Sequence, residues 1–308
     1  MSVFTTVSIP QLQSWLEGYA IGSLVELKGI SSGITNTNYF VTTTQNKYVL
    51  TLFEHNTMDE LPYFIDLMRH LAQHQILCPQ PISNQSGQAL HLLNGKPAVL
   101  ISCLSGRDIS SPNATHCAAV GVALANMHVA GQSYHAQSKN QRGQDWFTAT
   151  SQKVMPKLSA DEQVLLKSEL ELQANLTCTT MPQGVIHGDL FRDNVLFDGD
   201  KLGGIIDFYY ACNDCLAYDV AIAVNDWCLA ENGCLNDENL NALMTAYQAV
   251  RPFNHAEHSN WHKLLRRAAL RFWLSRLFDF HFPTDGDLTH AKDPNHFKRI
   301  LMQRIALQ

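Results

Sequence analysis

The sequence contains few charged residues. Only 16% of its 308 residues are Asp, Glu, Lys or Arg, against roughly 25% in an average soluble protein. Acidic residues outnumber basic ones by 28 to 22, so there is no basic surplus of the kind that indicates a nucleic-acid partner. Hydrophobic residues make up 45%, which excludes intrinsic disorder. We therefore expect a folded, globular protein for which nucleic acid is not the main partner.

Long apolar runs are also missing. The densest, such as residues 98–104, end far short of the roughly 18–20 residues that cross a membrane. The first twenty residues lack the basic start and apolar centre of a signal peptide. These absences predict a cytoplasmic protein without a membrane partner.

The eight cysteines form one C-x-x-C pair, Cys212 and Cys215. A structural zinc site usually needs a second pair of ligands at matching spacing. None is evident, although Cys228 and Cys234 lie near in sequence. Without an export signal, disulfides are not favoured either. We expect reduced, partly buried thiols, with a metal or redox site as the alternative.

The length allows two domains or one two-lobed unit, and the sequence patterns favour the second. Up to residue 103, strand patterns recur and two segments have helical spacing. The strands are expected at 24–30, 38–43, 47–53, 89–93 and 97–103, and the helices at 9–19 and 59–73. We predict an α+β protein with a β-rich N-terminal lobe, residues 1–103, and a mainly helical C-terminal lobe, residues 104–308.

The C-terminal lobe is expected to be helical apart from one insert. A helix begins near Ser111–Pro112, and residues 145–176 read as helix. A short β insert occupies residues 185–207, and residues 219–307 are mostly helical.

The β insert is expected to form a hairpin. Residues 195–197 and 204–206 are short apolar runs, and Asp198–Gly199 between them is a strong turn signal. An antiparallel hairpin brings Asn194 and Asp207 together at its open end. An amide oxygen beside a carboxylate is suited to Mg²⁺ rather than zinc.

Asp189 lies on the loop that enters this hairpin and can face the same point. The result is one carboxylate that accepts or orients a proton, beside two oxygen ligands for a cation. Phosphoryl transfer needs these parts, because its catalysis is mostly positioning and charge neutralisation. The structural alternatives are a turn-capping role for Asp189 and hairpin-end hydrogen bonds for Asn194 and Asp207. The spacing of all three favours chemistry.

The segment resembles a kinase catalytic loop. His187-Gly-Asp189-x-x-x-x-Asn194 has the spacing of H-R-D-x-x-x-x-N, and Asp207 in Ile-Ile-Asp-Phe stands where kinases carry the Asp of D-F-G. With Gly188 in place of Arg, the pattern is similar to the aminoglycoside-phosphotransferase-like small-molecule kinases.

That resemblance implies a two-lobed protein-kinase-like fold that uses ATP and Mg²⁺. It implies that Asp189 is catalytic and that Asn194 and Asp207 ligate the metal. His187 is then a structural residue that holds the loop. Asp219 is a candidate anchor for the loop backbone, with helix N-capping as its alternative.

Further segments resemble the homoserine kinase branch of that family. They lie at residues 48–54, 59–62, 205–214, 216–220, 249–252 and 269–272, so the likeness covers nearly the whole chain. It implies transfer of the ATP γ-phosphate to the side-chain hydroxyl of L-homoserine, giving O-phospho-L-homoserine for threonine biosynthesis. The chain lacks the P-x-x-x-G-L-G-S-S type loop of the unrelated homoserine kinase fold and the G-x-x-x-x-G-K-[ST] P-loop.

Two alternatives stay open. One is a kinase for another small alcohol, such as an aminoglycoside, choline or a thioribose. The other is a catalytically weak nucleotide-binding module. Thr51 leaves the nucleotide-binding module open as an alternative, because it occupies the position where kinases place the strand lysine that binds phosphates. The sequence does not identify the cation that replaces this lysine.

Nucleotide contacts are expected at two places. Residues 29–38 lie between two strands, where a kinase places its phosphate-covering loop, although a flexible β-turn is the alternative. The residues concerned are Ser32, Gly33, Thr35 and Asn36. The hinge strand would offer Ile101 and Cys103 to the adenine edge.

Two arginines are candidates for the substrate carboxylate. Arg271 and Arg276 lie among apolar neighbours on an expected helix over residues 261–282. A guanidinium fork is the natural partner of a carboxylate. The alternative is a solvated basic face.

Overall fold

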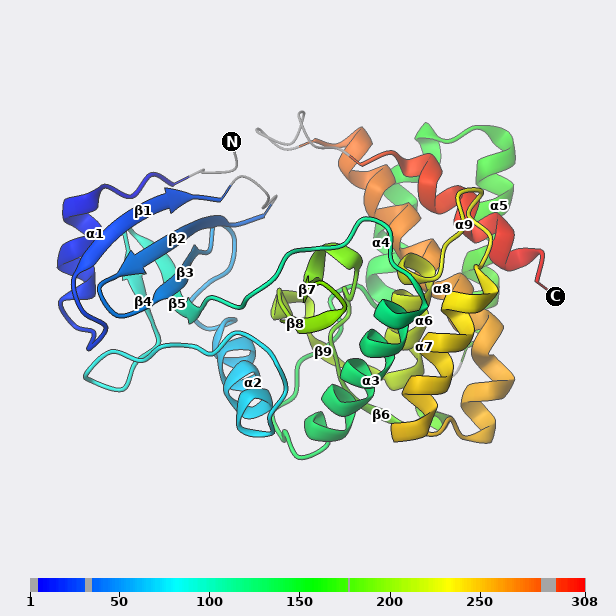
Figure 1. The fold of residues 1–308 in the computed structure, drawn as a ribbon. Helices are drawn as coiled ribbons and strands as arrows, with labels where there is room; N and C mark the ends of the chain where they lie inside the picture. The colour runs from blue at the N-terminus through cyan, green and yellow to red at the C-terminus, as the bar shows by residue number, and fades with distance from the viewer. Residues whose placement is uncertain (1–4, 31–34, 177, 284–291, 308) are drawn as a thin grey trace. The chain divides into compact units, whose positions relative to one another are not determined.

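The structure, a computed structural model, describes residues 5–30, 35–176, 178–283 and 292–307. The chain divides into two compact units, Met1–Ser105 and Gly106–Gln308 (Figure 1). None of the described helices is both long and apolar enough to cross a membrane.

The N-terminal unit is built on a five-stranded antiparallel sheet in the order β1-β2-β3-β5-β4. The strands are β1 (Leu24–Gly29), β2 (Thr37–Thr43), β3 (Lys47–Leu52), β4 (Leu90–Leu93) and β5 (Lys96–Ser102). Alternate residues of β2 are buried, as expected for a sheet with one packed face. The core of this unit joins Leu12 to Val41, Leu50 and Leu100. All five predicted strands are confirmed, with ends that differ by one residue.

Two helices complete this unit, α1 (Ile9–Leu16) and α2 (Pro62–Gln73). A capping box between Ser8 and Gln11 starts α1. The second helix begins three residues later than predicted. Pro62 occupies its first turn, where the fixed φ of proline suits a helix start and its missing N–H costs nothing.

The C-terminal unit is mainly helical. Its helices are α3 (Ala114–Gly131), α4 (Gln144–Val154), α5 (Ala160–Ala174), α6 (Leu216–Trp227), α7 (Asp237–Val250), α8 (His255–His281) and α9 (Pro294–Ile305). Helix α8 packs against α4, α5, α6 and α9, and α3 packs against α7. Fully buried Trp227 and Trp273 lie at the centre of this unit.

The helix predicted over residues 145–176 is two helices. Helix α4 ends at Val154, and Pro156 follows in a short 3-10 turn. Helix α5 then starts with a capping box of Ser159 and Glu162. The proline explains the break, because it removes a helical hydrogen bond and clashes with the preceding turn.

Two small ladders lie among these helices. Strand β6 (Gln183–Ile186) pairs with β9 (Cys212–Cys215), and β7 (Val195–Asp198) pairs with β8 (Lys201–Ile205). Strand β9 was not predicted, because its sequence Cys-Asn-Asp-Cys has neither apolar alternation nor β-branched residues. All eight cysteines are free thiols. In the described part of the chain, no three His, Cys, Asp or Glu side chains gather where they would hold a metal.

The close contact between α3 and α7 yields the first prediction. A Cβ atom added at Gly121 would lie 2.4 Å from the backbone oxygen of Leu243. We expect Gly121→Ala to lower the free energy of unfolding by about 1–3 kcal/mol, because the two helix backbones must separate. Urea denaturation measures this. Helix propensity alone predicts the opposite sign, a gain of about 1 kcal/mol, so a stabilised variant would contradict the packing argument. Asn126→Ala, at an exposed position of α3, is the control and should change stability little.

Candidate active site

The β7–β8 hairpin brings the predicted metal ligands to one end. Val195 pairs with Ile205 across the ladder, and the N–H of Ile206 donates to the carbonyl of Asn194 at 2.9 Å. Asp207 is the next residue. The predicted hairpin is therefore confirmed, and its register places Asn194 beside the segment that carries Asp207.

The side chain of Asn194 is tied to Asp189. Its amide nitrogen donates to the backbone oxygen of Asp189 at 2.8 Å and to the Oδ2 atom of Asp189 at 3.3 Å. No described residue donates a hydrogen bond to its Oδ1 atom, so this oxygen is available to a ligand. With Asn194 only 9% exposed, its amide orientation is fixed by these two bonds.

Asp207 has an unusual backbone. It adopts φ 64° and ψ 64°, the left-handed region that disfavours residues with a Cβ atom, and its side chain is exposed. Such conformations persist where the surrounding structure enforces them, and they cluster at functional sites. The Asp207 carboxylate and the Asn194 amide oxygen are hard ligands, so this donor set fits a divalent cation of the Mg²⁺ type.

The carboxyl group of Asp189 has a raised pKa. Burial raises the pKa of its carboxyl to about 7; Arg271 opposes this rise, and Asp207 adds to it. A carboxylate with a pKa near neutrality is well matched to accepting a proton at physiological pH. Asp189 is partly buried and directly follows Gly188 in the loop.

One buried carboxylate, that of Asp219, holds the backbone of the loop that leads to Asp189. The backbone N–H groups of His187 and Gly188 donate to the two oxygens of Asp219, at 2.7 and 2.8 Å. The Nε2 atom of His128 lies 3.0 Å from Asp219 as well. Burial alone would raise the pKa of Asp219, but these hydrogen bonds and the nearby histidines outweigh it and lower the pKa. Cys215 is the N-cap of α6, so Asp219 does not have the capping role that was its alternative.

His187 ties the loop to the hairpin. Its Nε2 atom lies 2.9 Å from the carbonyl oxygen of Ile206, and its Nδ1 atom accepts from the N–H of Asp189 at 3.3 Å. The ring also packs edge-on against Phe208, with centroids 4.9 Å apart. Burial lowers the pKa of His187, so the ring is neutral and bridges a donor and an acceptor. These contacts are those of a residue that holds the loop in place.

The glycine at position 188 is required by its surroundings. It adopts φ +75°, and a Cβ atom there would lie 2.8 Å from the carbonyl oxygen of Tyr210. This explains why a glycine stands where the protein-kinase loop has an arginine.

Arg271 and Arg276 have different surroundings. Arg271 is buried, donates to the carbonyl of Gly188 and lies over the Phe272 ring at 4.6 Å. Arg276 donates to the carbonyl of Asp293 at 3.4 Å and lies over a ring of α9. A solvated face therefore does not describe Arg271. A direct role of either arginine in binding the substrate stays a prediction.

The predicted nucleotide contacts lie in the N-terminal unit. Ser32 and Gly33 fall outside the described residues. Thr35 is exposed, and the Asn36 side chain accepts a hydrogen bond from the N–H of Glu54 at 3.4 Å. Their contact with a nucleotide stays a prediction.

The expected hinge strand is β5. Ile101 is buried in this strand opposite Val49, and Cys103 directly follows the last strand residue. Thr51, in the lysine position, is buried and donates to the Asn38 side chain at 2.7 Å. Its hydroxyl is therefore used within the sheet.

A buried polar chain behind Asp219 was missed by sequence reasoning. The Nδ1 atom of His128 lies 2.7 Å from the hydroxyl of Tyr247, which accepts from Arg251 at 3.0 Å. Arg251 in turn pairs with buried Glu257 at 2.6 Å. His128 occurs at helical spacing among apolar residues, so its sequence pattern reads as core. The sequence feature that could have revealed this buried polar chain is a histidine within an otherwise apolar helical stripe.

Comparisons with known proteins agree with this geometry. The model of the phosphotransferase enzyme family matches residues 26–253. The chain belongs to the phosphotransferase enzyme family. A homoserine kinase of Methylobacillus flagellatus is 56% identical over 99% of this chain and 96% of its own length. Homoserine kinases of Methylobacillus glycogenes and of a Janthinobacterium species are 53% and 46% identical over the same shares of each chain.

Solved structures of the family share the fold at low identity. An amicoumacin kinase in complex with AMP-PNP, Ca²⁺ and Ami superimposes with a TM-score of 0.75 at 13% identity, over 98% of both chains. A spectinomycin phosphotransferase in complex with ADP superimposes with a TM-score of 0.69 at 13% identity, over 98% of this chain and 99% of the other. The predicted kinase-like fold and family membership are confirmed.

The raised pKa of Asp189 predicts a pH dependence. Below about pH 7 the carboxyl is protonated and cannot accept a proton, so kcat/KM for the acceptor should rise from pH 5 to pH 8. A bound cation favours the ionised form, which shifts the midpoint below 7. The free energy of unfolding should also fall as the pH rises from about 4 to 7. The pKa of Asp189 is raised in the folded state, so in this range the unfolded chain releases the proton that the folded protein keeps. Initial rates across this range test the prediction, and a flat profile down to pH 5 would contradict it.

The anchoring role of Asp219 gives a separate prediction. In Asp219→Asn one acceptor oxygen becomes a donor that faces a backbone N–H. We expect the free energy of unfolding to fall by about 1–3 kcal/mol and kcat to fall at least tenfold, with KM for the nucleotide changed much less. Steady-state kinetics and urea denaturation measure both. Asp200→Asn, at an exposed position, is the control. A variant with normal kcat would show that the loop holds its shape without this carboxylate.

Proposed function

We propose that this protein is a homoserine kinase, which transfers the γ-phosphoryl group of ATP to the side-chain hydroxyl of L-homoserine to give O-phospho-L-homoserine. The observation that carries the proposal is the grouping of Asp189, Asn194 and Asp207 on one hairpin and its entering loop. The full-length relatives that are named homoserine kinase support the choice of acceptor.

Asp189 is the group that acts on the acceptor hydroxyl. Its carboxylate orients the hydroxyl and takes up the proton as the new oxygen–phosphorus bond forms. The amide of Asn194 holds the Asp189 side chain at 3.3 Å, which limits the positions that the carboxylate can adopt. Asp219 and His187 hold the backbone on either side of it.

Asn194 and Asp207 would hold Mg²⁺. The metal, when bound, neutralises charge on the ATP phosphates. The residues contribute two oxygen ligands of different kinds, a neutral amide and a carboxylate. Asp207 adopts the left-handed region directly after the hairpin, which sets the direction in which its side chain leaves the backbone.

ATP is assigned to the N-terminal lobe, residues 1–103, and the acceptor to the C-terminal lobe, residues 104–308. The loop at residues 29–38 would cover the phosphates, and Ile101 and Cys103 would meet the adenine. A cytoplasmic location and a role in threonine biosynthesis belong to the same proposal.

Kinases of other small alcohols are the second candidate. The solved neighbours include a microcompartment-associated aminopropanol kinase and a choline kinase, at 16% and 14% identity. Likeness at this level supports the fold alone. The acceptor is therefore argued from the relatives that align over the whole chain, and an acceptor panel separates the two candidates.

The test is ADP release with Mg²⁺ and a panel of homoserine, serine, choline and an aminoglycoside. We expect homoserine to give the highest kcat/KM. Asp189→Asn should lower kcat by about 10²- to 10⁴-fold, because it removes the proton acceptor and retains the shape. Asp207→Asn should raise the Mg²⁺ concentration needed for half-maximal activity.

Asp198→Asn is the matched control, because it removes the same charge at the far, exposed end of the same hairpin. It should keep activity within a few-fold. Preference for another alcohol would replace homoserine as the acceptor, and absence of any acceptor-dependent ADP release would favour the nucleotide-binding module.

A further inference from the structure

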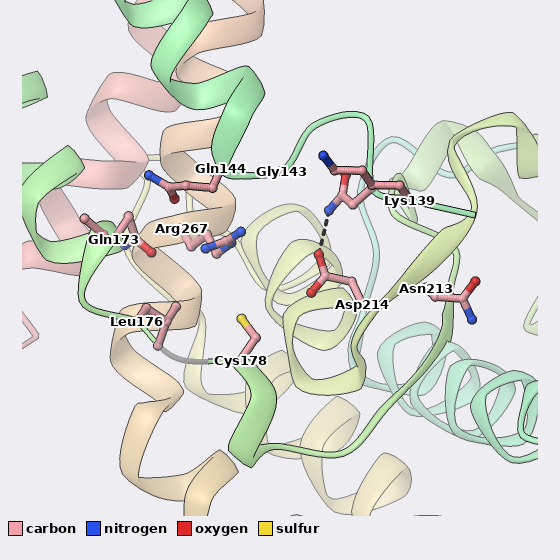
Figure 2. Close-up of a pocket in the computed structure, with 11 residues that line it drawn as sticks. Lys139, Gly143, Gln144, Gln173, Leu176, Cys178, Asn213, Asp214 and Arg267 are labelled. Atoms are coloured by element: carbon pink, nitrogen blue, oxygen red, sulfur yellow. Dashed lines mark hydrogen bonds between the residues drawn. The ribbon is translucent and has the colours of Figure 1, made fainter. Parts of the chain in front are cut away.

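A pocket in the C-terminal unit is lined by an arginine and an aspartate that do not pair with each other. It lies beside the loop before α4, the end of α5 and strand β9, and its volume is about 340 Å³. Figure 2 shows Arg267 and Asp214 at this pocket, with Gln173 and Cys178 nearby. This volume is at the small end for ligand pockets, as suits a metabolite with few atoms.

Arg267 has a charge without a partner. Its side chain comes from α8 and is 6% exposed. The guanidinium lies 5.3 Å from the Phe147 ring and 5.4 Å from the Tyr218 ring, and its buried Nε atom has no hydrogen-bond partner. No ion pair joins it to any residue that the structure describes. A buried guanidinium stays charged, and its planar fork matches a carboxylate.

Asp214 is the opposite charge in the pocket. Its Oδ2 atom accepts from the amide of Asn140 at 2.6 Å, and its Oδ1 atom accepts from the N–H of Cys215 at 2.7 Å. These bonds fix the carboxylate and leave part of its capacity unused, because an ionised carboxylate has about four acceptor positions. No described cation forms an ion pair with it. It can therefore also accept bonds from a ligand ammonium group.

Lys139 also lines the pocket but is paired with Asp145 at 2.6 Å, which leaves Arg267 and Asp214 as its charged groups without an ion-pair partner among the described residues. A fixed positive group and a fixed negative group in one small pocket match a ligand that carries both charges. The α-carboxylate and α-ammonium of an amino acid are such a pair. An amine without a carboxylate would leave Arg267 unpaired, which is costly for a buried charge. The pocket is thus complementary to an α-amino acid rather than to a simple amino alcohol.

Helix α8 connects the pocket to the loop that carries Asp189. Arg271, four residues after Arg267, donates to the carbonyl of Gly188. Residues four apart lie on the same helix face about 6 Å apart along the axis. A four-carbon hydroxy amino acid extends about 5 Å from its carboxylate to its hydroxyl, at bond lengths of about 1.5 Å. Its hydroxyl would therefore point along α8 towards the loop that carries Asp189.

We propose that Arg267 and Asp214 form the subsite that recognises the α-carboxylate and the α-ammonium group of the acceptor amino acid. The assignment rests on the proposed function, because it takes homoserine as the acceptor. It moves carboxylate recognition from Arg271, which is used by the catalytic loop, to the arginine one turn earlier.

Three acceptors test the recognition of the carboxylate and of the ammonium group separately. Homoserine carries both, 3-aminopropan-1-ol lacks the carboxylate, and 4-hydroxybutanoate lacks the ammonium group. We expect Arg267→Met to lower kcat/KM for homoserine about 10- to 100-fold and to leave kcat/KM for 3-aminopropan-1-ol nearly unchanged. Asp214→Asn should lower kcat/KM for homoserine and for 3-aminopropan-1-ol, and should leave 4-hydroxybutanoate nearly unchanged. KM for ATP should stay the same in both variants.

Lys263→Met is the matched control. It removes a positive charge from the same helix, one turn before Arg267 and outside the pocket, and should leave the preference among the three acceptors unchanged. Thermal melting of each variant shows whether it folds. Arg267→Lys provides a second variant if the methionine variant is unstable, and it should lose part of the preference, because an ammonium cannot form the bidentate pair.

The outcomes distinguish this proposal from the proposed function. If the wild-type protein does not phosphorylate homoserine, the proposed function fails. The subsite assignment alone is overturned if the wild-type protein does phosphorylate homoserine and neither variant changes kcat/KM for homoserine. It is also overturned if Arg267→Met lowers kcat/KM for homoserine and 3-aminopropan-1-ol equally, or if Asp214→Asn lowers kcat/KM for homoserine and 4-hydroxybutanoate equally. Calorimetry compares homoserine binding to the wild-type protein and to the Arg267 variant. If the variant loses this binding but keeps kcat/KM for homoserine, the pocket is a separate amino-acid site, and the assignment is also overturned.

Discussion

The pair of hydrogen bonds from the backbone of His187 and Gly188 to Asp219 is the interaction on which the candidate site depends. A buried carboxylate is stable only if its oxygens are satisfied, and here two consecutive backbone N–H groups and His128 do this. The same bonds determine the direction in which the next residue, Asp189, leaves the loop. The position of the Asp189 carboxylate therefore depends on a buried residue of α6 as well as on the loop itself. His128 extends this support through Tyr247 to a buried ion pair.

The fold was predicted well where a local pattern determines it. The strands of the N-terminal unit follow apolar alternation and turn residues, and the β7–β8 hairpin follows from Asp198–Gly199 between two apolar runs. Strand β9 could not be predicted in this way. It forms because β6 offers it a partner, so a tertiary contact and not its own composition decides its structure. Pro156 did signal the break between α4 and α5, and the periodicity on both sides of it concealed that signal.

The site could be predicted only as far as spacing along the chain reveals it. Asp189, Asn194 and Asp207 are close in sequence, so a single hairpin brings them together. Arg267 and Asp214 are more than fifty positions apart on different elements, and nothing local connects them. The buried environment of Arg267 is the informative fact, and helical periodicity cannot separate it from its neighbour Arg266, which pairs with Glu169 at 2.5 Å. A side chain such as Arg267, whose role is inferred from the lack of an ion-pair partner among the described residues, can be identified only from the three-dimensional structure.

The glycine at position 188 couples the loop around Asp189 to the turn at residues 208–210, and this limits which residues can replace it. Because a Cβ atom at position 188 would lie 2.8 Å from the carbonyl oxygen of Tyr210, the loop around Asp189 and the turn after Asp207 leave no room for a side chain there. An arginine of the protein-kinase kind cannot enter at 188 unless the 208–210 turn moves first, and a moved turn would displace Asp207. The two segments are therefore sterically coupled: while the 208–210 turn keeps its position, residue 188 must be a glycine, and an arginine there requires a second, coordinated change in the turn.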